Sequence, residues 1–81
     1  MKIVFTFVYH NGYSSKISFQ ITQKEESLFD FLYETIRQKM KNRCNDIQDV
    51  INMAGALEGD VLISLNDIIE VKMRKENASE T

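Results

Sequence analysis

Few side chains in this sequence carry the chemistry of a catalyst. His10 is the one imidazole, and it precedes Asn11-Gly12, where a polar loop residue is expected. Cys44 is the one thiol, and it follows basic residues that could lower its pKa and make it reactive. Because no second Cys and no nearby His accompany it in the sequence, we interpret Cys44 as an ordinary thiol at a helix end.

Metal and cofactor sites are equally poorly represented. Cys and His are too few for a zinc site. The carboxylate pairs Asp46 and Asp49, and Glu58 and Asp60, lack the ligand spacing of an EF-hand loop, and the glycines form no phosphate-binding loop. We therefore expect no catalytic residue, no metal and no cofactor, and we predict that the protein is not an enzyme.

Two groups of residues have the chemistry of a binding surface instead. The first is a basic run that could contact phosphate or an acidic partner in a salt-dependent manner, Arg37, Lys39, Lys41 and Arg43. A solvated helix end, where cations match the helix dipole, explains the same run. The net charge of −2 argues against general nucleic-acid binding, so we keep phosphate or nucleic-acid binding as the alternative function.

The second group lies on alternate residues of predicted strands. One face of the predicted sheet carries small apolar and hydroxyl side chains beside charged ones: Val4, Thr6, Val8, Lys16, Glu70 and Lys72. Exposed apolar atoms there would supply affinity for a protein partner, and the lysines would orient that partner. A plain solvent-facing sheet is the simpler interpretation of the same residues.

Length and composition limit these surfaces to one small domain. The chain has 81 residues, 43% hydrophobic and 27% charged, which is ordinary for a compact protein and too short for two cores. No apolar run approaches the roughly 18 residues that span a membrane. The apolar start is short and leads to no small-residue cleavage site, so we do not interpret it as a signal peptide. The single Cys then favours a reducing, cytoplasmic location.

Residues 2–22 predict two strands joined by a turn, and their pairing decides which side chains face the core. A two-residue turn at Asn11-Gly12 would leave two phenylalanines in water. A three-residue loop, His10-Asn11-Gly12, pairs Tyr9 with Tyr13 instead and places Gly12 at the left-handed position of a bulge. This register gives one buried face, made of Ile3, Phe5, Phe7, Ile17, Phe19 and Ile21.

The next segment has the pattern of an amphipathic helix. Thr22 and Glu25 form a capping-box pattern, which predicts a helix start at this point. At about 100° per residue, the apolar side chains fall within an arc of roughly 140°: Leu28, Phe29, Leu32, Tyr33, Ile36 and Met40. This arc would cover the hairpin, whereas Phe31 lies outside it and should be partly exposed.

The C-terminal half gives weaker signals. Residues 46–54 fit either helical spacing or a short strand, and Glu58-Gly59-Asp60 predicts a turn before a further short strand. Apolar and charged residues then alternate, which predicts a last strand with one apolar face made of Ile69, Val71 and Met73.

This order of elements resembles the β-grasp fold of the ubiquitin-like superfamily. The resemblance is most specific at the front, where a strand after Met1, a bulged turn at Gly12 and a helix capped by Thr22 follow one another. It implies an α+β fold with a mixed sheet, in which the last strand lies parallel to the first in the middle of the sheet. A right-handed crossover permits that connection. Residues 1–75 would form this single domain, and residues 76–81 a flexible tail.

Three branches of the superfamily differ in residues that this sequence allows us to compare. Conjugated ubiquitins and sulfur carriers end in Gly-Gly, whereas no Gly follows Gly59 here, so carrier chemistry is not expected. PB1 interaction domains have an acidic signature that is similar to Leu57–Asp60, but most of its acidic positions are missing here. The small bacterial ubiquitin-like proteins of type VII secretion systems lack the Gly pair and resemble this chain in length and start.

The resemblance implies a small regulatory or assembly factor that docks another protein through the outer sheet face. We therefore predict a non-catalytic protein–protein interaction module of unknown partner, with the basic helix end as the alternative site. A homodimer stays open, either through the exposed hairpin edge or through the basic helix end against Glu58 and Asp60 of a second copy.

Overall fold

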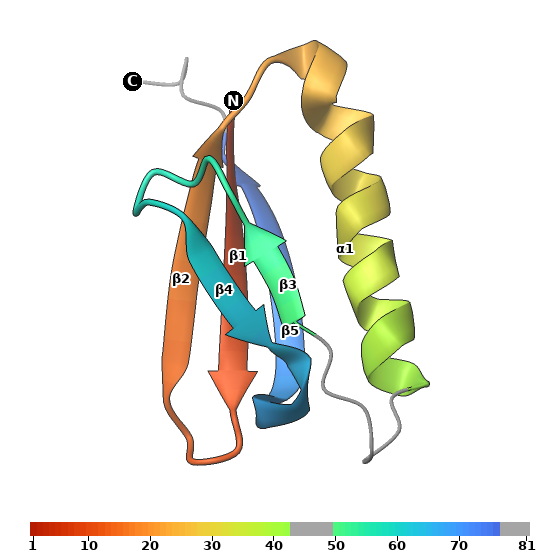
Figure 1. The fold of residues 1–81 in the computed structure, drawn as a ribbon. Coiled ribbons are helices and arrows are strands. Elements are labelled where there is room, and N and C mark those ends of the chain that lie inside the picture. Colours follow the sequence, from red (N-terminus) through yellow and green to blue (C-terminus); the bar gives the residue numbers. More distant parts are fainter. Residues whose placement is uncertain (43–49, 77–81) are drawn as a thin grey trace.

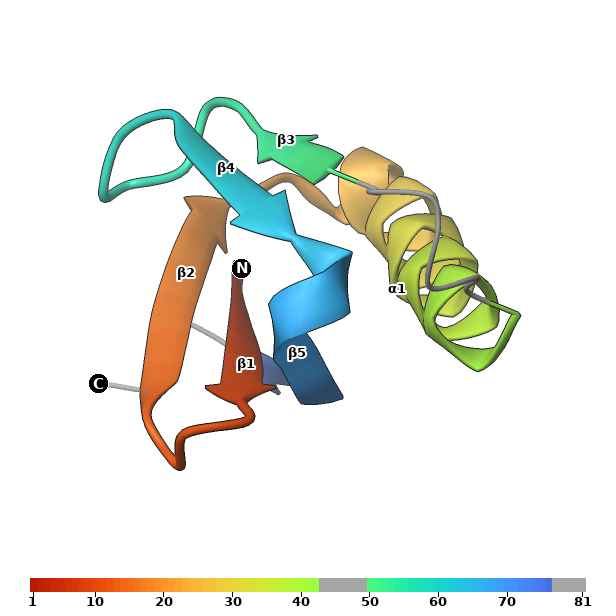
Figure 2. The ribbon, with the colours of Figure 1, turned by 60° about the horizontal axis from the view of Figure 1, so that its bottom comes forward.

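The structure, a computed structural model, describes residues 1–42 and 50–76. The described part contains β1 (Lys2–Tyr9), β2 (Ser14–Gln20), the short turn η1 (Gln23–Glu25), α1 (Glu26–Lys41), β3 (Val50–Met53), β4 (Val61–Ser64), the short turn η2 (Leu65–Asp67) and β5 (Ile68–Glu76). The strands form a three-stranded sheet, β2-β1-β5, and a two-stranded sheet, β3-β4. The two-stranded sheet lies over one face of the larger sheet, and α1 runs beside β5 (Figures 1 and 2). The protein is a small α+β fold with one helix packed on antiparallel strands.

The N-terminal hairpin has the predicted register. Tyr9 donates its backbone N–H to the carbonyl of Tyr13 at 2.8 Å, and Phe5 lies opposite Ile17. Gly12 closes the loop at φ 90°, a left-handed backbone that glycine adopts without a Cβ clash, and it donates its N–H to the carbonyl of Tyr9. The predicted buried face is confirmed, because each of its six side chains is buried.

The helix start is also as predicted. Glu25 accepts from both the backbone N–H and the hydroxyl of Thr22 at 3.0 Å, and the short turn η1 then leads into α1. The apolar arc covers the hairpin through ring contacts such as Phe29 on Phe19, whose centroids are 5.0 Å apart. Leu28 is the exception, since it lies at the margin of the arc and is exposed rather than buried, and Phe31 is exposed as expected.

The segment left open between helix and strand is a strand where the structure describes it. Val50–Met53 forms β3 and pairs with β4, so that Ile51 lies opposite Ile63 and Met53 opposite Val61. Met53 and Ile63 are buried and join the core of the larger sheet. Residues 46–49 of that prediction lie outside the described residues.

The direction of the last strand corrects the prediction of a parallel pair. β5 runs antiparallel to β1, with Lys2 opposite Glu76 and Phe5 opposite Met73 (Figure 1). The physical reason is the short turn η2, which delivers the chain to the far end of β1, where His10 donates its backbone N–H to the carbonyl of Asp67. A strand that begins there must run back along β1. All strand pairs in the described residues are therefore antiparallel, and the prediction of a mixed sheet is wrong for these strands.

A bulge at the start of β5 corrects a second prediction. Glu70 lies opposite Val8, but Ile68 lies opposite Tyr9, so that Ile69 is an extra residue without a partner across the sheet. Ile68 is therefore fully buried, whereas Ile69 is 52% exposed. The buried face of β5 thus contains Ile68 in place of Ile69. β5 also includes Glu76, one residue into the predicted tail, and residues 77–81 lie outside the described residues.

Candidate functional site

The predicted binding residues of the sheet do lie together on its outer face, the face turned away from α1. Thr6 in the central strand is flanked by Lys16 of β2 and Lys72 of β5, and Val8 is flanked by Glu70. Lys72 and Glu70 form an exposed ion pair at 3.4 Å. Within the described residues, Lys16 has no ion-pair partner. The antiparallel pairing of β1 and β5 therefore brings these residues together, although a parallel pairing of the two strands was predicted.

Val4 does not contribute the exposed apolar atoms that were expected of it. Its side chain is only 4% exposed, because β1 is the central strand and Val4 is flanked by Ser18 on one side and Arg74 on the other. Of these two neighbours Arg74 has the longer side chain, and the aliphatic part of an arginine can cover a shorter neighbour. The apolar part of the outer face instead consists of the half-buried Thr6 and Val8 together with Ile69, which the bulge turns outward.

The edge formed by β2 is closed by the chain itself. The backbone of Ser18 faces away from β1, and there its carbonyl accepts from the N–H of Leu57 at 2.8 Å. The N–H of Ser18 donates to Oε1 of Glu58, also at 2.8 Å. This backbone donor lowers the pKa of the Glu58 carboxyl, and burial opposes the shift. The loop after β3 thus occupies the position of a neighbouring strand, and the exposed hairpin edge expected from the sequence is closed at Ser18.

The edge formed by β5 is open. Met1 and Ile21 exchange both backbone hydrogen bonds, so the odd-numbered residues of β1 bond to β2 and the even-numbered ones bond to β5. Thr6 therefore bonds toward Lys72, and the residues of β5 on either side of Lys72 point their backbone groups outward. Across residues 1–42 and 50–76, the outward N–H and C=O groups of Val71 and Met73 have no backbone partner.

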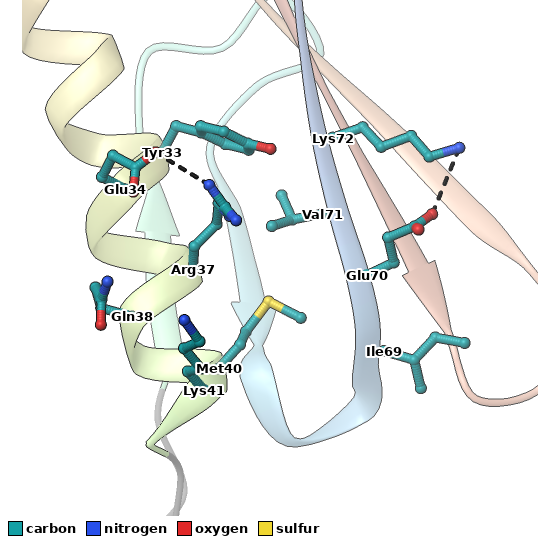
Figure 3. Close-up of a pocket in the computed structure, with 10 residues that line it drawn as sticks. All are labelled: Tyr33, Glu34, Arg37, Gln38, Met40, Lys41, Ile69, Glu70, Val71 and Lys72. Atoms are coloured by element: carbon teal, nitrogen blue, oxygen red, sulfur yellow. Dashed lines mark hydrogen bonds and ion pairs between the residues drawn. The ribbon is translucent and has the colours of Figure 1, made fainter.

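A groove runs along this open edge, between β5 and the C-terminal half of α1. Its volume is about 850 Å³, and Figure 3 shows helix side chains pointing toward Val71 while Glu70 and Lys72 lie on the other side of the strand. The lining residues are Tyr33, Glu34, Arg37, Gln38, Met40, Lys41, Ile69, Glu70, Val71 and Lys72. A volume of this size is in the range of pockets that hold ligands.

The charges of the groove are predominantly positive. Arg37 bonds to Glu34 at 3.2 Å, and its guanidinium lies 5.6 Å from the centre of the Tyr33 ring. Lys72 is paired with Glu70. Of the lining cations, Lys41 has no ion-pair partner in the described part of the chain. The groove thus holds three cations and two carboxylates, with Lys41 available to an outside anion.

The far end of the groove is fastened by an ion-pair cluster. Lys75 donates to Asp30 and to Glu26, each at 2.8 Å, and so joins β5 to the first turns of α1. The hydrogen bond to Asp30, followed by the bond to Glu26, raises the pKa of Lys75. This cluster is a direct side-chain connection between β5 and the N-terminal part of α1.

The predicted basic run does not form one patch. Arg37 and Lys41 both line the groove, since residues four apart share a helix face. Lys39 lies about 200° around the axis from Arg37, and Arg43 lies outside the described residues. The groove was not predicted, because nothing in the helix pattern indicates which strand lies beside it. The spacing of Tyr33, Arg37 and Lys41 is the one signal that could have indicated a shared face.

The remaining candidate residues of the sequence lie apart from these surfaces or outside the described ranges. His10 lies in the exposed hairpin loop, and Cys44 lies outside the described residues. In the described ranges no three His, Cys, Asp or Glu side chains gather in a way that could hold a metal ion. No helix in those ranges is long and apolar enough to cross a membrane.

No family model, curated protein or solved structure matches this chain.

Proposed function

We propose that this chain is a non-catalytic protein-binding module that docks a partner protein on the outer face of the β2-β1-β5 sheet. The observation that carries the proposal is Ile69, which the bulge holds half exposed beside Val8, on the face that also presents Lys16 and Lys72. Aliphatic side chains with charged side chains on the same face have the composition of a binding surface, with an apolar centre and a charged rim. A ubiquitin-like role remains part of this proposal through the order of the elements, although β1 and β5 pair in the opposite direction.

The charge of the outer face favours an acidic partner. Alternation places four cations on this face, Lys2, Lys16, Lys72 and Arg74, against the carboxylates of Glu70 and Glu76. The whole chain has a net charge of −2, so the basic face is a local feature. Opposite charge on a partner would speed and orient docking, and salt would weaken it.

A quantitative affinity capture from the native cell tests this function. The bait is the chain itself, and the variants are Lys16→Glu and Ile69→Asp. Lys24→Glu is the matched control, because Lys24 lies in η1, away from the outer face, and carries the same change of charge. We expect the recovery of at least one protein to fall for both outer-face variants and not for the control. If both outer-face variants recover every captured protein as well as the control does, the proposal is wrong.

Phosphate or nucleic-acid binding through the basic helix end is the alternative function, and it predicts that the chain retards RNA or DNA in a gel. Arg37 is already paired with Glu34, and the described cations of the run are divided around the helix, so they do not face one phosphate group together. We expect no gel retardation of RNA or DNA at low salt. Retardation that is lost in Lys41→Glu but not in Lys16→Glu would contradict our assignment.

A further inference from the structure

We propose that the open edge of β5 accepts an extended acidic segment of a partner protein, which adds to the sheet as a fourth strand within the groove beside α1. This second site goes beyond the function proposed above, because it uses the backbone edge and the groove rather than the outer face. Three independent features of the structure support it.

The first feature is the difference between the two edges of the sheet. At β2 the edge is closed at Ser18 by Leu57 and Glu58, through two hydrogen bonds of 2.8 Å. At β5 the outward groups of Val71 and Met73 have no backbone partner in the described part of the chain. An open row of N–H and C=O groups is the template on which strand addition occurs. By the same alternation Ser14 and Lys16 of β2 also face outward, so the β2 edge is interrupted at Ser18, whereas no such interruption is found in the described residues at Val71 and Met73.

The second feature is the space along that edge. The groove of about 850 Å³ lies directly beside Val71, with Tyr33 and Met40 forming the opposite wall (Figure 3). A neighbouring strand needs about 4.8 Å of lateral space. The cluster of Lys75 with Glu26 and Asp30 fastens one end of the groove, so a segment would enter from the Ile69 end and add a short strand.

The third feature is charge. Lys41 is the lining cation without an ion-pair partner in residues 1–42 and 50–76, and Arg37 lies four residues before it on the same face of α1. An added strand directs alternate side chains toward α1, where a carboxylate could reach Lys41. A second copy of this chain would bring its own Lys41, Arg37 and Lys72 to the same edge, which like charge disfavours. The favoured occupant is thus an acidic segment of another protein.

Nuclear magnetic resonance of the ¹⁵N-labelled chain tests this inference. The probe is an acetylated and amidated octapeptide of alternating Val and Glu, titrated to about 2 mM so that weak binding is seen. A slip of one residue turns either set of side chains toward α1, so the peptide needs no designed register. One control peptide replaces Glu by Lys, and a second carries an N-methyl group on every residue, which removes the donors from both edges of the added strand.

We expect the amide signals of Val71 and Met73 to shift and their hydrogen exchange to slow, with the Glu peptide only. We expect Lys41→Glu to weaken binding about fivefold, and Lys24→Glu to leave it unchanged. Binding that survives N-methylation, equal binding of the Lys peptide, shifts confined to the outer face at Thr6 and Lys16, or no shift at all would overturn the inference. A shift of Val71 and Met73 on concentrating the chain alone would assign the edge to a second copy and overturn it as well. The peptide assay measures binding at the β5 edge only. A negative result would therefore leave the outer-face proposal untouched, because the capture experiment tests that proposal separately.

Discussion

Two adjacent isoleucines at the start of β5 allow the bulge to be tested, because the same substitution can be made at either position and the two variants compared. Ile68 is fully buried and Ile69 is 52% exposed, although strict alternation with Val71 and Met73 would bury Ile69 instead. Replacing each by alanine removes the same three carbons from neighbouring positions of the same strand. The loss of strand propensity is similar in the two variants, so the difference between them reports burial.

The expected magnitudes follow from these exposures. At Ile68 the lost transfer free energy is about 0.8 kcal/mol for each of three carbons, and the cavity left behind raises the total to about 3–4 kcal/mol. At Ile69 about half of that transfer term applies and water fills the space, so the cost is about 1 kcal/mol. We therefore expect Ile68→Ala to lower the free energy of unfolding by about 2–3 kcal/mol more than Ile69→Ala.

Urea unfolding followed by circular dichroism measures this difference, provided that the dependence on urea is the same in both variants. A chain of this size has a total stability of about 4–12 kcal/mol, so Ile68→Ala could unfold the protein. The milder pair Ile68→Val and Ile69→Val then gives the same comparison at about a third of the magnitude. An equal or larger loss at Ile69 would refute the bulge and restore strict alternation.

Three further predictions concern single side chains. Val4→Asp should unfold the protein or lower its melting temperature sharply, because it buries an unpaired carboxylate. Val8→Asp should remain folded. Equal melting temperatures of the two variants would contradict the burial of Val4. The lowered pKa of Glu58 stabilises the fold above the ordinary pKa of 4.5, and this stabilisation is lost as pH falls through the lower folded value. We therefore expect the free energy of unfolding to fall less steeply with acid in Glu58→Gln than in the parent chain. Identical acid slopes would argue against the bond from Ser18. The raised pKa of Lys75 stabilises the fold below the ordinary pKa of 10.5, and this stabilisation is lost as pH rises through the higher folded value. We therefore expect the free energy of unfolding of Lys75→Met to depend less on pH in the alkaline range. An unchanged alkaline dependence would exclude the cluster with Asp30.

The N-terminal half of the fold could be predicted because its signals are local. A glycine that tolerates a positive φ and a strict alternation in β2 allow only one pairing that buries Phe5 and Phe7. The capping pattern of Thr22 and Glu25 likewise lies within four residues of sequence. Where the determining contacts are near in sequence, the pattern alone was sufficient.

The C-terminal half depends on contacts that are distant in sequence. The direction of β5 follows from where η2 leaves the chain, and no residue of β5 encodes that position. Ile68 and Ile69 are chemically identical, so alternation fits either phase and only the bulge decides between them. The closure of the β2 edge joins Ser18 to Glu58, 40 residues away, and no periodicity reports it.

The candidate site divides in the same way. Alternation was sufficient to collect the residues of the outer face, because cross-strand neighbours share a face whether strands run parallel or antiparallel. Burial was not predictable for Val4, since Thr6 and Val8 lie on the same face of the same central strand and are only half-buried, and alternation does not distinguish the three. The groove depends on the placement of α1 relative to β5, which is a tertiary property.

The closure of the β2 edge limits how far an assembly of three-stranded sheets can grow. A sheet that is open on both sides can join neighbours without end, and a row of such molecules becomes a fibre. Here the bonds of Leu57 and Glu58 to Ser18 interrupt the β2 edge, so a strand that runs the length of the sheet can be received only at β5. A segment of a partner protein added at β5 therefore ends the growth of the sheet, because no full-length strand can follow on the β2 side. Loss of the Glu58 carboxylate would free only the N–H of Ser18, because its carbonyl would keep the bond from Leu57, so the barrier to growth of the sheet is made of two separate contacts.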